Sequence, residues 1–257
     1  MTIQVEKKQA VTTIILNRPE ARNAVNRPTA DALAHAFREF EQDESASVAV
    51  LSGHETFCAG ADLKAVASGE DSNRLAVDGD GPMGPSRMLL SKPVIAAIEG
   101  HAVAGGLELA LSCDMILAAE HATFALPEIR SGTVADAASL KLPKRIPYHI
   151  AMEMLLTGRW MQAEEAARWG LINRIHPADT LMTEAHALAD LLASGPPLVY
   201  AAIKEIVRES EDMKFQDALN RITQSQFETV DILYNSEDQL EGARAFAEKR
   251  DPVWKGR

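Results

Sequence analysis

The sequence is short of positive charge. Its 26 lysine and arginine residues face 37 aspartates and glutamates, which gives a formal net charge of −11. A nucleic-acid surface needs a basic patch, and anionic membranes attract basic segments, so the composition argues against both kinds of partner. A phosphate-bearing ligand is still compatible with this charge, because backbone amides and a few local lysines or arginines can supply a positive field.

Cysteines and long apolar runs are scarce as well. Cys58 and Cys113 lie in apolar surroundings without a spacing motif, which is typical of reduced core thiols in a cytosolic protein. Residues 1–8 lack the apolar segment of a signal peptide, and no run approaches the ~18 residues of a membrane span. We therefore expect a cytoplasmic protein. Metal-ligand spacings and a dinucleotide fingerprint are also missing, so we expect no metal or redox cofactor.

What is present is a repeated strand, small-residue turn and helix. Strand-like residues 48–51 lead into a turn at 57–63, and strand-like residues 93–98 lead into a turn at 100–106. This repetition predicts stacked β/α units. Beyond residue 177 the pattern is helical throughout. We predict an α/β core at 1–177 that holds the site and a helical region at 178–257 that closes the core or is buried between subunits.

The second turn carries the chain's most unusual pattern. Gly105 and Gly106 stand at a helix start, where backbone amides have no intrahelical partner and suit an anion or a developing oxyanion. Glu108 follows on the same helical face, with apolar neighbours that should raise its pKa and suit it to proton transfer. The alternative is a glycine packing site with a glutamate that reaches solvent or caps the turn.

Two further acids stand in unusual surroundings. Glu128 follows a proline at a strand end, and Asp136 lies among small apolar residues just inside a predicted helix. Each acid alone fits a structural role such as a helix cap. Together with two amide-presenting turns, however, two carboxylates could move protons beside a carbonyl oxygen that the amides hold. A polar loop at 68–86 is either plain surface or a cover for a ligand.

At these residues the chain resembles the crotonase (enoyl-CoA hydratase/isomerase) superfamily. Residues 57–64 are similar to the family's first oxyanion and CoA segment, 105–108 to its second, and 124–128 to the segment with the second acid. The resemblance implies a ClpP-like fold of ββα units, with a C-terminal helical region that forms a homotrimer or a dimer of trimers. It also implies an acyl-CoA thioester as substrate, with coenzyme A as part of that substrate and no separate cofactor.

The resemblance also implies roles for single residues. The amides of Ala61 and Gly105 would hold the thioester oxygen, Glu108 would activate water, and Glu128 would move the proton at the α-carbon. The implied CoA and substrate contacts are Asn23, Ala24, Ala59, Ala61, Asp62, Leu63, Lys64, Gly105 and Lys249. The implied reaction adds water to a 2-enoyl-CoA or removes it from a 3-hydroxyacyl-CoA. Residues 124–128 and the tail 246–257 are closest to the family's dehydratases and imply carnitinyl-CoA among the candidate substrates.

The chain departs from the common hydratase pattern at 133–139. Asp136 stands where the family's dienoyl-CoA isomerases place a catalytic acid. It could therefore move protons in a dienoyl-CoA or enoyl-CoA isomerase, bind a polar or cationic acyl tail, or cap a helix. A non-catalytic acyl-CoA binder with the same fold is a third hypothesis, because a fold does not fix a function.

Overall fold

The computed structural model describes residues 1–69, 80–81 and 83–257. Most of the polar loop at 68–86 therefore lies outside the described residues. The chain divides into two compact units. The first comprises Met1–Leu89 and Val94–Asp190, and the second comprises Leu90–Pro93 and Leu191–Arg257.

A six-stranded sheet forms the centre of the first unit, in the order β1-β2-β3-β4-β6-β9. Its strands are β1 (Ile3–Lys8), β2 (Val11–Leu16), β3 (Val48–Gly53), β4 (Val94–Ile98), β6 (Met115–Ala119) and β9 (Arg174–His176). Strands β1 and β2 pair antiparallel, and each later pair is parallel. Buried residues run without a break along β4, as expected for a parallel strand covered on both faces.

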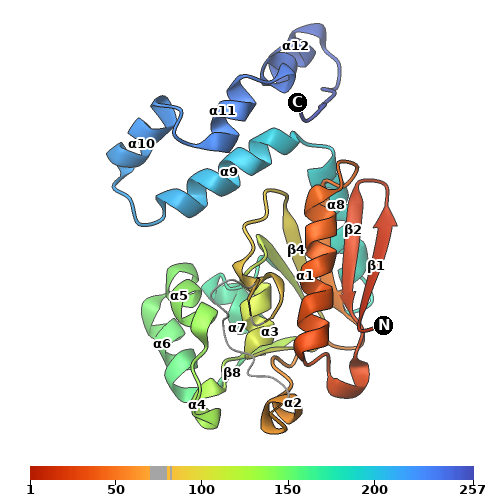
Figure 1. Ribbon diagram of the computed structural model, residues 1–257, viewed down its shortest axis with the longest axis vertical. Helices are drawn as coiled ribbons and strands as arrows, with labels where there is room; N and C mark the ends of the chain where they lie inside the picture. Colours follow the sequence, from red (N-terminus) through yellow and green to blue (C-terminus); the bar gives the residue numbers. More distant parts are fainter. Residues whose placement is uncertain (70–79, 82) are drawn as a thin grey trace. The chain divides into compact units, whose positions relative to one another are not determined.

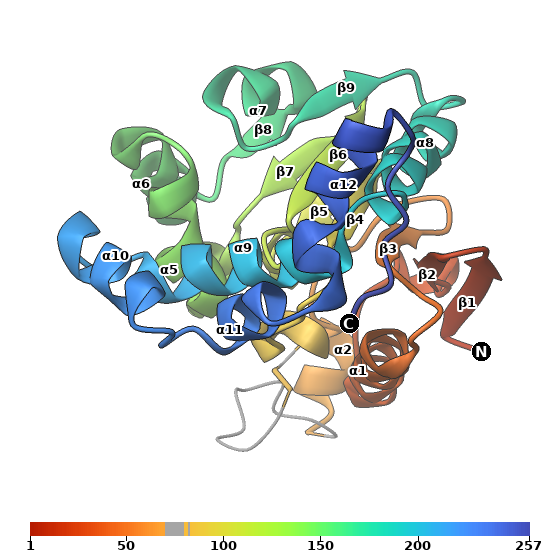
Figure 2. The same cartoon turned by 90° about the horizontal axis from the view of Figure 1, so that it is seen from above.

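Helices α1 (Arg27–Gln42) and α8 (Leu181–Ala193) lie on opposite faces of this sheet (Figures 1 and 2). The Asn26 side chain caps α1 by accepting a hydrogen bond from the amide of Thr29, and Leu33, Phe37 and Phe40 are buried. On the other face, His186 Nε2 of α8 lies 3.0 Å from Thr13 Oγ1 of β2. The predicted α/β core is thus a sheet between helical layers.

A second, three-stranded sheet positions the turns of interest. Strand β5 (His101–Val103) pairs parallel with β7 (Thr123–Ala125), which pairs antiparallel with β8 (Trp160–Gln162). Helix α3 (Gly105–Ala110) follows β5, and helix α4 (Glu128–Ser131) follows β7. Because β5 and β7 are parallel neighbours, these helices begin at the same edge of the small sheet. The remaining helices of the first unit are α2 (Leu63–Ala67), α5 (Asp136–Arg145), α6 (Tyr148–Thr157), α7 (Ala163–Trp169) and the 3₁₀ turns η1 (Pro19–Ala21) and η2 (Pro85–Arg87).

The second unit is helical. It contains α9 (Pro197–Ser210), α10 (Phe215–Thr223), α11 (Glu228–Tyr234), η3 (Glu237–Leu240) and α12 (Glu241–Glu248). A small apolar core forms around Ala202, Phe227 and Val230. The buried carboxylate of Glu205 accepts hydrogen bonds from the amides of Glu228 and Thr229, so α9 caps the start of α11.

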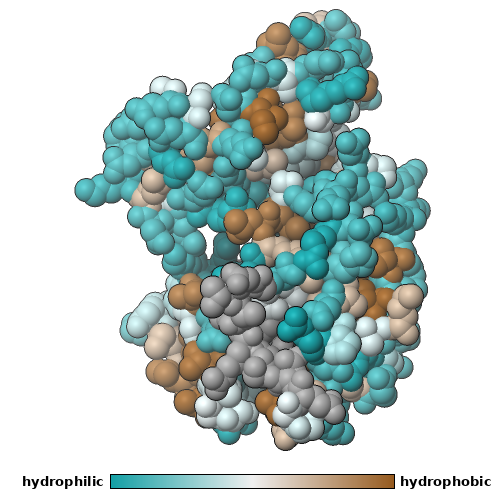
Figure 3. Space-filling view, viewed as in Figure 1, coloured by the Kyte–Doolittle hydropathy of each residue, from teal (hydrophilic) through white to brown (hydrophobic). Residues whose placement is uncertain are grey.

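The face in Figure 3 is largely hydrophilic, with small apolar groups between the polar residues. Several large apolar side chains of the second unit are exposed, among them Ile203, Val207, Phe215 and Phe246. Among the described residues, no helix has the length and apolar character that crossing a membrane requires.

Candidate active site

The two small-residue turns lie against each other. The amide of Cys58 donates to the carbonyl of His101 at 2.9 Å, and the amide of Val103 donates to the carbonyl of Cys58 at 3.0 Å. A Cβ atom added to Gly106 would lie 2.2 Å from that Cys58 oxygen. Only glycine therefore allows the start of α3 to approach the first turn so closely.

This contact brings Gly60 beside the amide of Gly105. A Cβ atom added to Gly60 would lie 3.1 Å from Gly105 N, and Gly60 has a φ of +91°. Ala61 follows Gly60 directly. Neither the Ala61 amide nor the Gly105 amide donates to an acceptor within the part of the chain that the structure describes. Two unused donors from separate turns thus occupy one small region.

Backbone strain marks the entry to α3. Ala104 has a φ of 54°, in a region that non-glycine residues rarely adopt. Its amide donates to the carbonyl of Ala125 at 2.9 Å, and its carbonyl accepts from the amides of Leu107 and Glu108. These bonds hold the residue in place, and strain held in this way is typical of functional turns.

Glu108 is a buried acid on α3, with 6% of its surface exposed. Its Oε1 accepts a hydrogen bond of 2.9 Å from the amide of Ala138, so this carboxyl faces the start of α5. Burial raises the pKa of Glu108 and nearby Asp136 raises it further, whereas the amides of Ala138 and Ala137 and the charge of Lys141 lower it, with a net increase. The side chain is thus buried and not solvent-exposed, and the pKa shift has the direction that the sequence predicts.

Glu128 is the second acid of this region and begins α4. Its Oε2 is buried and has no hydrogen-bond partner among the described residues. Burial raises the pKa of Glu128 to about 7, with further increases from the charges of Glu108 and Asp136. A hydrogen bond from its own backbone amide lowers this pKa in part. A carboxyl that titrates near neutral pH can gain or release a proton readily.

Asp136 is exposed and is the first residue of α5. The N-cap of that helix is Ala135, which makes no side-chain cap hydrogen bond. Asp136 contributes to the raised pKa values of both Glu108 and Glu128, so the three carboxyls lie within electrostatic range of one another. The structure therefore brings together all three acids that the sequence singles out.

Two of the predicted CoA contacts, Asn23 and Asp62, use their side chains for hydrogen bonds within the protein. The Asn23 amide group is buried and bonds to the amide of Arg18 and to the carbonyls of His54 and Thr56. Asp62 Oδ2 accepts from Arg18 at 3.1 Å, and its Oδ1 accepts from the amides of Lys64 and Ala65 at the start of α2. Both side chains are thus engaged within the protein, and a ligand would meet the backbone of these segments.

The other predicted contacts are more open. Ala24, Ala59 and Ala61 are partly exposed, and Leu63 and Lys64 are exposed on α2. Lys249 ends α12 in the second unit, where it is exposed with a φ of 56°.

Sequence reasoning assigned no role to two residues that contact this region. Arg18 binds Asp62, and Lys141 Nζ lies 3.0 Å from Ser112 Oγ and influences Glu108. Arg18 belongs to an Asn-Arg-Pro motif, and that motif could have drawn attention to it in the sequence. No sequence pattern distinguishes Lys141.

A surface hollow lies where β2, β3 and β4 end. It is lined by Pro19, Arg22, Glu55, Thr56, Gly100 and His101. Over the described ranges, no group of three or more His, Cys, Asp or Glu side chains is placed to hold a metal ion.

Comparisons with known proteins agree with this architecture. The family model described as enoyl-CoA hydratase/isomerase matches residues 6–257. Proteins named carnitinyl-CoA dehydratase from Proteus mirabilis and Salmonella paratyphi A are each 44% identical over 264 aligned positions, which cover 100% of this chain and 99% of each relative. These names bear out the predicted enzyme class, a hydro-lyase.

Solved structures give the same result. Enoyl-CoA hydratases from Mycobacterium tuberculosis and Mycobacterium marinum each superpose with a TM-score of 0.91 at 40% identity, covering 100% of this chain and 99% of theirs. The predicted crotonase fold is therefore confirmed. With a family match over nearly the whole chain and relatives well above 30% identity, the chain belongs to the enoyl-CoA hydratase/isomerase family.

Proposed function

We propose that this protein is a hydro-lyase that adds water to 2-enoyl-CoA thioesters and removes it from 3-hydroxyacyl-CoA thioesters. The observation that carries the proposal is the pair Glu108 and Glu128, two acids with raised pKa values. They lie next to two turns whose Ala61 and Gly105 amides meet no acceptor among the residues that the structure describes. Coenzyme A arrives as part of the substrate, and the reaction needs no other cofactor.

The reaction follows from these groups. The amides of Ala61 and Gly105 donate to the thioester oxygen and stabilise the negative charge that develops there, which is worth about 3 kcal/mol per donor. Glu108, as the carboxylate, takes a proton from water while the water oxygen bonds to the β-carbon. The electron pair of the double bond moves toward the thioester oxygen, and protonated Glu128 then donates its proton to the α-carbon. Dehydration reverses each step.

For the acyl group we propose a polar or cationic tail, carnitinyl among the candidates. Support comes from the relatives named carnitinyl-CoA dehydratase and from exposed Asp136, whose carboxylate can attract a cationic acyl tail. The CoA part would lie against Asn23, Ala24, Ala59, Asp62, Leu63 and Lys64. Lys249, of the same chain or of a neighbouring subunit, would bind its phosphates.

We also propose that residues 178–257 assemble the protein as a homotrimer or a dimer of trimers in the cytoplasm. The exposed apolar residues of α9, α10 and α12 support this assembly. We further propose that the protein has neither a nucleic-acid nor a membrane partner, in keeping with its formal net charge of −11.

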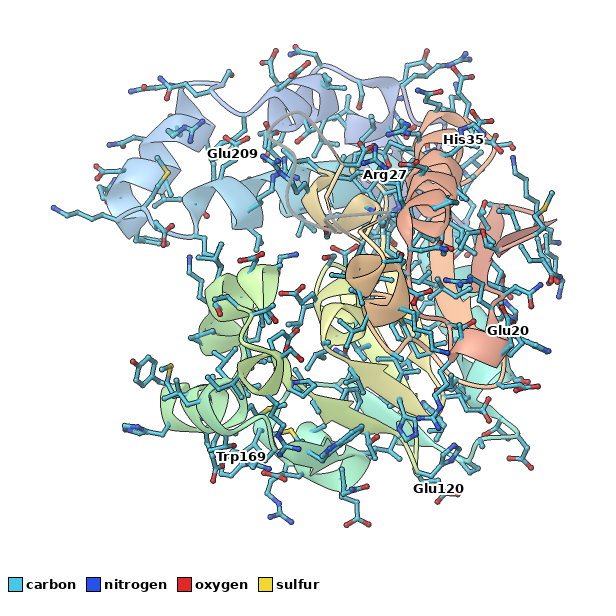
Figure 4. The ribbon with its side chains drawn as sticks, turned by 60° about the horizontal axis from the view of Figure 1, so that its bottom comes forward. Glu20, Arg27, His35, Glu120, Trp169 and Glu209 are labelled. Carbon is cyan, nitrogen blue, oxygen red and sulfur yellow. The ribbon has the colours of Figure 1, made fainter. Side chains whose placement is uncertain are left out.

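The decisive experiment compares Glu108→Gln and Glu128→Gln with the unchanged enzyme on a panel of crotonyl-CoA, longer enoyl-CoAs, crotonobetainyl-CoA and a dienoyl-CoA. Loss of one acid from an acid–base pair typically costs about 10²–10⁴-fold in rate. Binding of CoA should stay near that of the unchanged enzyme. Glu120→Gln is the matched control, since Glu120 is an exposed acid after β6 (Figure 4). If both acid variants hydrate crotonyl-CoA at the unchanged rate, the assignment is wrong.

A second candidate function is double-bond isomerisation, which the position of Asp136 beside the two glutamates favours. An isomerase would shift a double bond without incorporating oxygen from labelled water, and Asp136→Asn would abolish that reaction. A non-catalytic binder would bind CoA esters and turn over none of the panel.

A further inference from the structure

Arg18 joins the first turn to residues 24–25, the segment that pairs with it. One terminal nitrogen of its guanidinium donates to the carbonyl of Ala24 at 2.5 Å, and the other donates to Asp62 Oδ2 at 3.1 Å. Both charged side chains are largely buried, with 16% of Arg18 and 14% of Asp62 exposed. The weaker partner Glu20 lies 4.0 Å away in η1 and is labelled in Figure 4.

The segments that Arg18 joins are themselves paired around Ala61. The amide of Val25 donates to the carbonyl of Gly60 at 2.8 Å, and the amide of Asp62 donates to the carbonyl of Val25 at 2.9 Å. Both bonds flank Ala61 in a parallel bridge, which leaves the Ala61 amide pointing away from Val25. The direction of this amide is thus set by how firmly residues 24–25 and 60–62 are held together.

Packing holds Gly60, which precedes Ala61, but not the helix that follows Ala61. The buried Asn23 side chain anchors residues 22–25 to the loop after β3. On the other side, α2 has five residues and none of them is buried. Asp62 therefore fixes the end of the turn through its carboxylate, with one oxygen on the start of α2 and the other on Arg18. Burial raises the pKa of Asp62, but the hydrogen bonds from Arg18 and from the amides of Ala65 and Lys64 outweigh it, so this carboxyl stays ionised.

We infer that Arg18 is a positioning residue for the first oxyanion donor: by bridging Ala24 and Asp62, its guanidinium fixes the direction of the Ala61 amide. The inference rests on the proposed function, in which that amide holds the thioester oxygen. Arginine suits the task because its planar fork reaches two acceptors at once, whereas lysine carries a single ammonium on a flexible chain. If Arg18 only stabilised the fold, its loss would not change the polarisation of a bound thioester.

The test uses a spectroscopic readout on the full-length protein. Binding of a conjugated, slowly reacting 3-arylacryloyl-CoA shifts its absorption to longer wavelength when hydrogen bonds polarise the thioester carbonyl. In Arg18→Met we expect this shift to shrink and kcat for crotonyl-CoA to fall by about 10–100-fold, as expected for a donor misplaced by up to about 1 Å. The dissociation constant for CoA should change by less than about threefold, because Arg18 is not itself a proposed CoA contact and the buried Asn23 side chain still anchors residues 22–25. Arg18→Lys should recover part of both signals.

Two further variants keep the test decisive. Asp62→Asn retains an oxygen to cap α2 but weakens the charged bond to Arg18, so it should reproduce the smaller shift, and the double variant should add little to either single one. Arg27→Met is the matched control, because Arg27 pairs with Asp31 at 2.8 Å on the exposed face of α1 (Figure 4). It should leave the shift and kcat unchanged. Asp62→Asn decides the question by itself if Arg18→Met does not fold.

The outcomes separate the inference from the proposed function. A full spectral shift in folded Arg18→Met or Asp62→Asn overturns the positioning role, whatever happens to kcat. If the unchanged enzyme shows the spectral shift but hydrates no enoyl-CoA, the proposed reaction is wrong. The spectral shift in the Arg18 and Asp62 variants then still decides the positioning role. No shift in the unchanged enzyme overturns both.

Discussion

At the residue scale, the site depends on placing acids where water solvates them poorly. Glu128 has a buried oxygen that meets no hydrogen-bond partner in the described part of the chain, and Glu108 uses one oxygen to accept from the start of α5. Burial is the main cause of the raised pKa of each. The charge of Asp136 adds to both shifts, and the charge of Glu108 adds to that of Glu128. Interacting acids of this kind share their protons as a pair, and the proposed chemistry needs one proton on the two groups.

The pair predicts the pH dependence of the rate. Hydration begins with Glu108 ionised and Glu128 protonated, and dehydration begins with the proton on Glu108. Both directions therefore require one proton on the pair, and kcat/KM should follow the same bell-shaped curve in each. Since the pKa of Glu128 is about 7, we expect the alkaline limb near pH 7. A rate that is flat from pH 6 to 9 in initial-rate assays would contradict this assignment.

The same pKa predicts how stability changes with pH. A carboxyl whose pKa rises from 4.5 in the unfolded chain to about 7 in the folded chain binds more protons when folded. Its contribution is fully present below pH 4.5 and is lost as pH rises through about 7. Glu128→Gln should therefore be more stable than the unchanged protein at pH 8, by about 1–2 kcal/mol once solvent screening of this half-buried group is included.

Urea unfolding at pH 8 and pH 5 checks this prediction. The difference between Glu128→Gln and the unchanged protein should shrink as pH falls. Glu120→Gln serves again as the exposed control and should show no such trend. A difference that stays constant between the two pH values would mean that the Glu128 carboxyl titrates normally.

At the scale of elements, the parallel pair β5 and β7 explains why the site forms here. Parallel neighbours end at the same edge, so Gly105 after β5 and Glu128 after β7 are brought together although they are far apart in sequence. The first turn then approaches through Gly60, where Ala104 Cβ and the Val103 carbonyl leave no room for a side chain. Glycine is required there by both space and backbone angle.

A pair of glycine substitutions separates these two requirements. Gly60 and Gly170 both have positive φ, but a Cβ added to Gly170 would meet nothing within 4 Å. Gly170→Ala should cost about 1–2 kcal/mol in unfolding free energy, the usual penalty of the left-handed backbone. Gly60→Ala should cost a further ~1–3 kcal/mol for the clash and should lower kcat as well. Denaturant melts and crotonyl-CoA assays measure both effects, and equal losses in the two variants would exclude a tight approach at Gly60.

At the scale of the whole molecule, the chain consists of a sheet-based unit and a helical unit with a small core of its own. In the helical unit the side chains of Phe215 and Phe246 are 78% and 86% exposed. Large apolar side chains gathered on a surface are typical of a protein–protein interface. The sequence boundary at 177 and the division between compact units after Asp190 both fall near α8. We therefore expect the helical unit to bury this apolar surface against other copies of the chain.

Light scattering should show three or six chain masses for the unchanged protein. Phe215→Asp should shift this distribution toward smaller species, because the charge must be desolvated in an apolar interface. Gln216→Asp, on the same exposed helix, introduces the same charge and should leave the assembly intact. A monomer at micromolar concentration would contradict the proposed trimer.

The sequence by itself determined the family, the α/β architecture and the three unusual acids, because apolar periodicity, paired glycines and ordered motifs are local properties of the chain. Only the tertiary structure decided that Asn23 and Asp62 use their side chains within the protein, that Ala135 rather than Asp136 occupies the N-cap of α5, and that Arg18 bridges two segments. The two acceptors of the Arg18 side chain, Ala24 and Asp62, lie 6 and 44 residues away from it in the sequence. No local pattern encodes which distant carbonyl or carboxylate a side chain will meet. The raised pKa of Glu128 likewise comes from burial and from charges on other elements, which exist only once the parallel strands have brought those elements together.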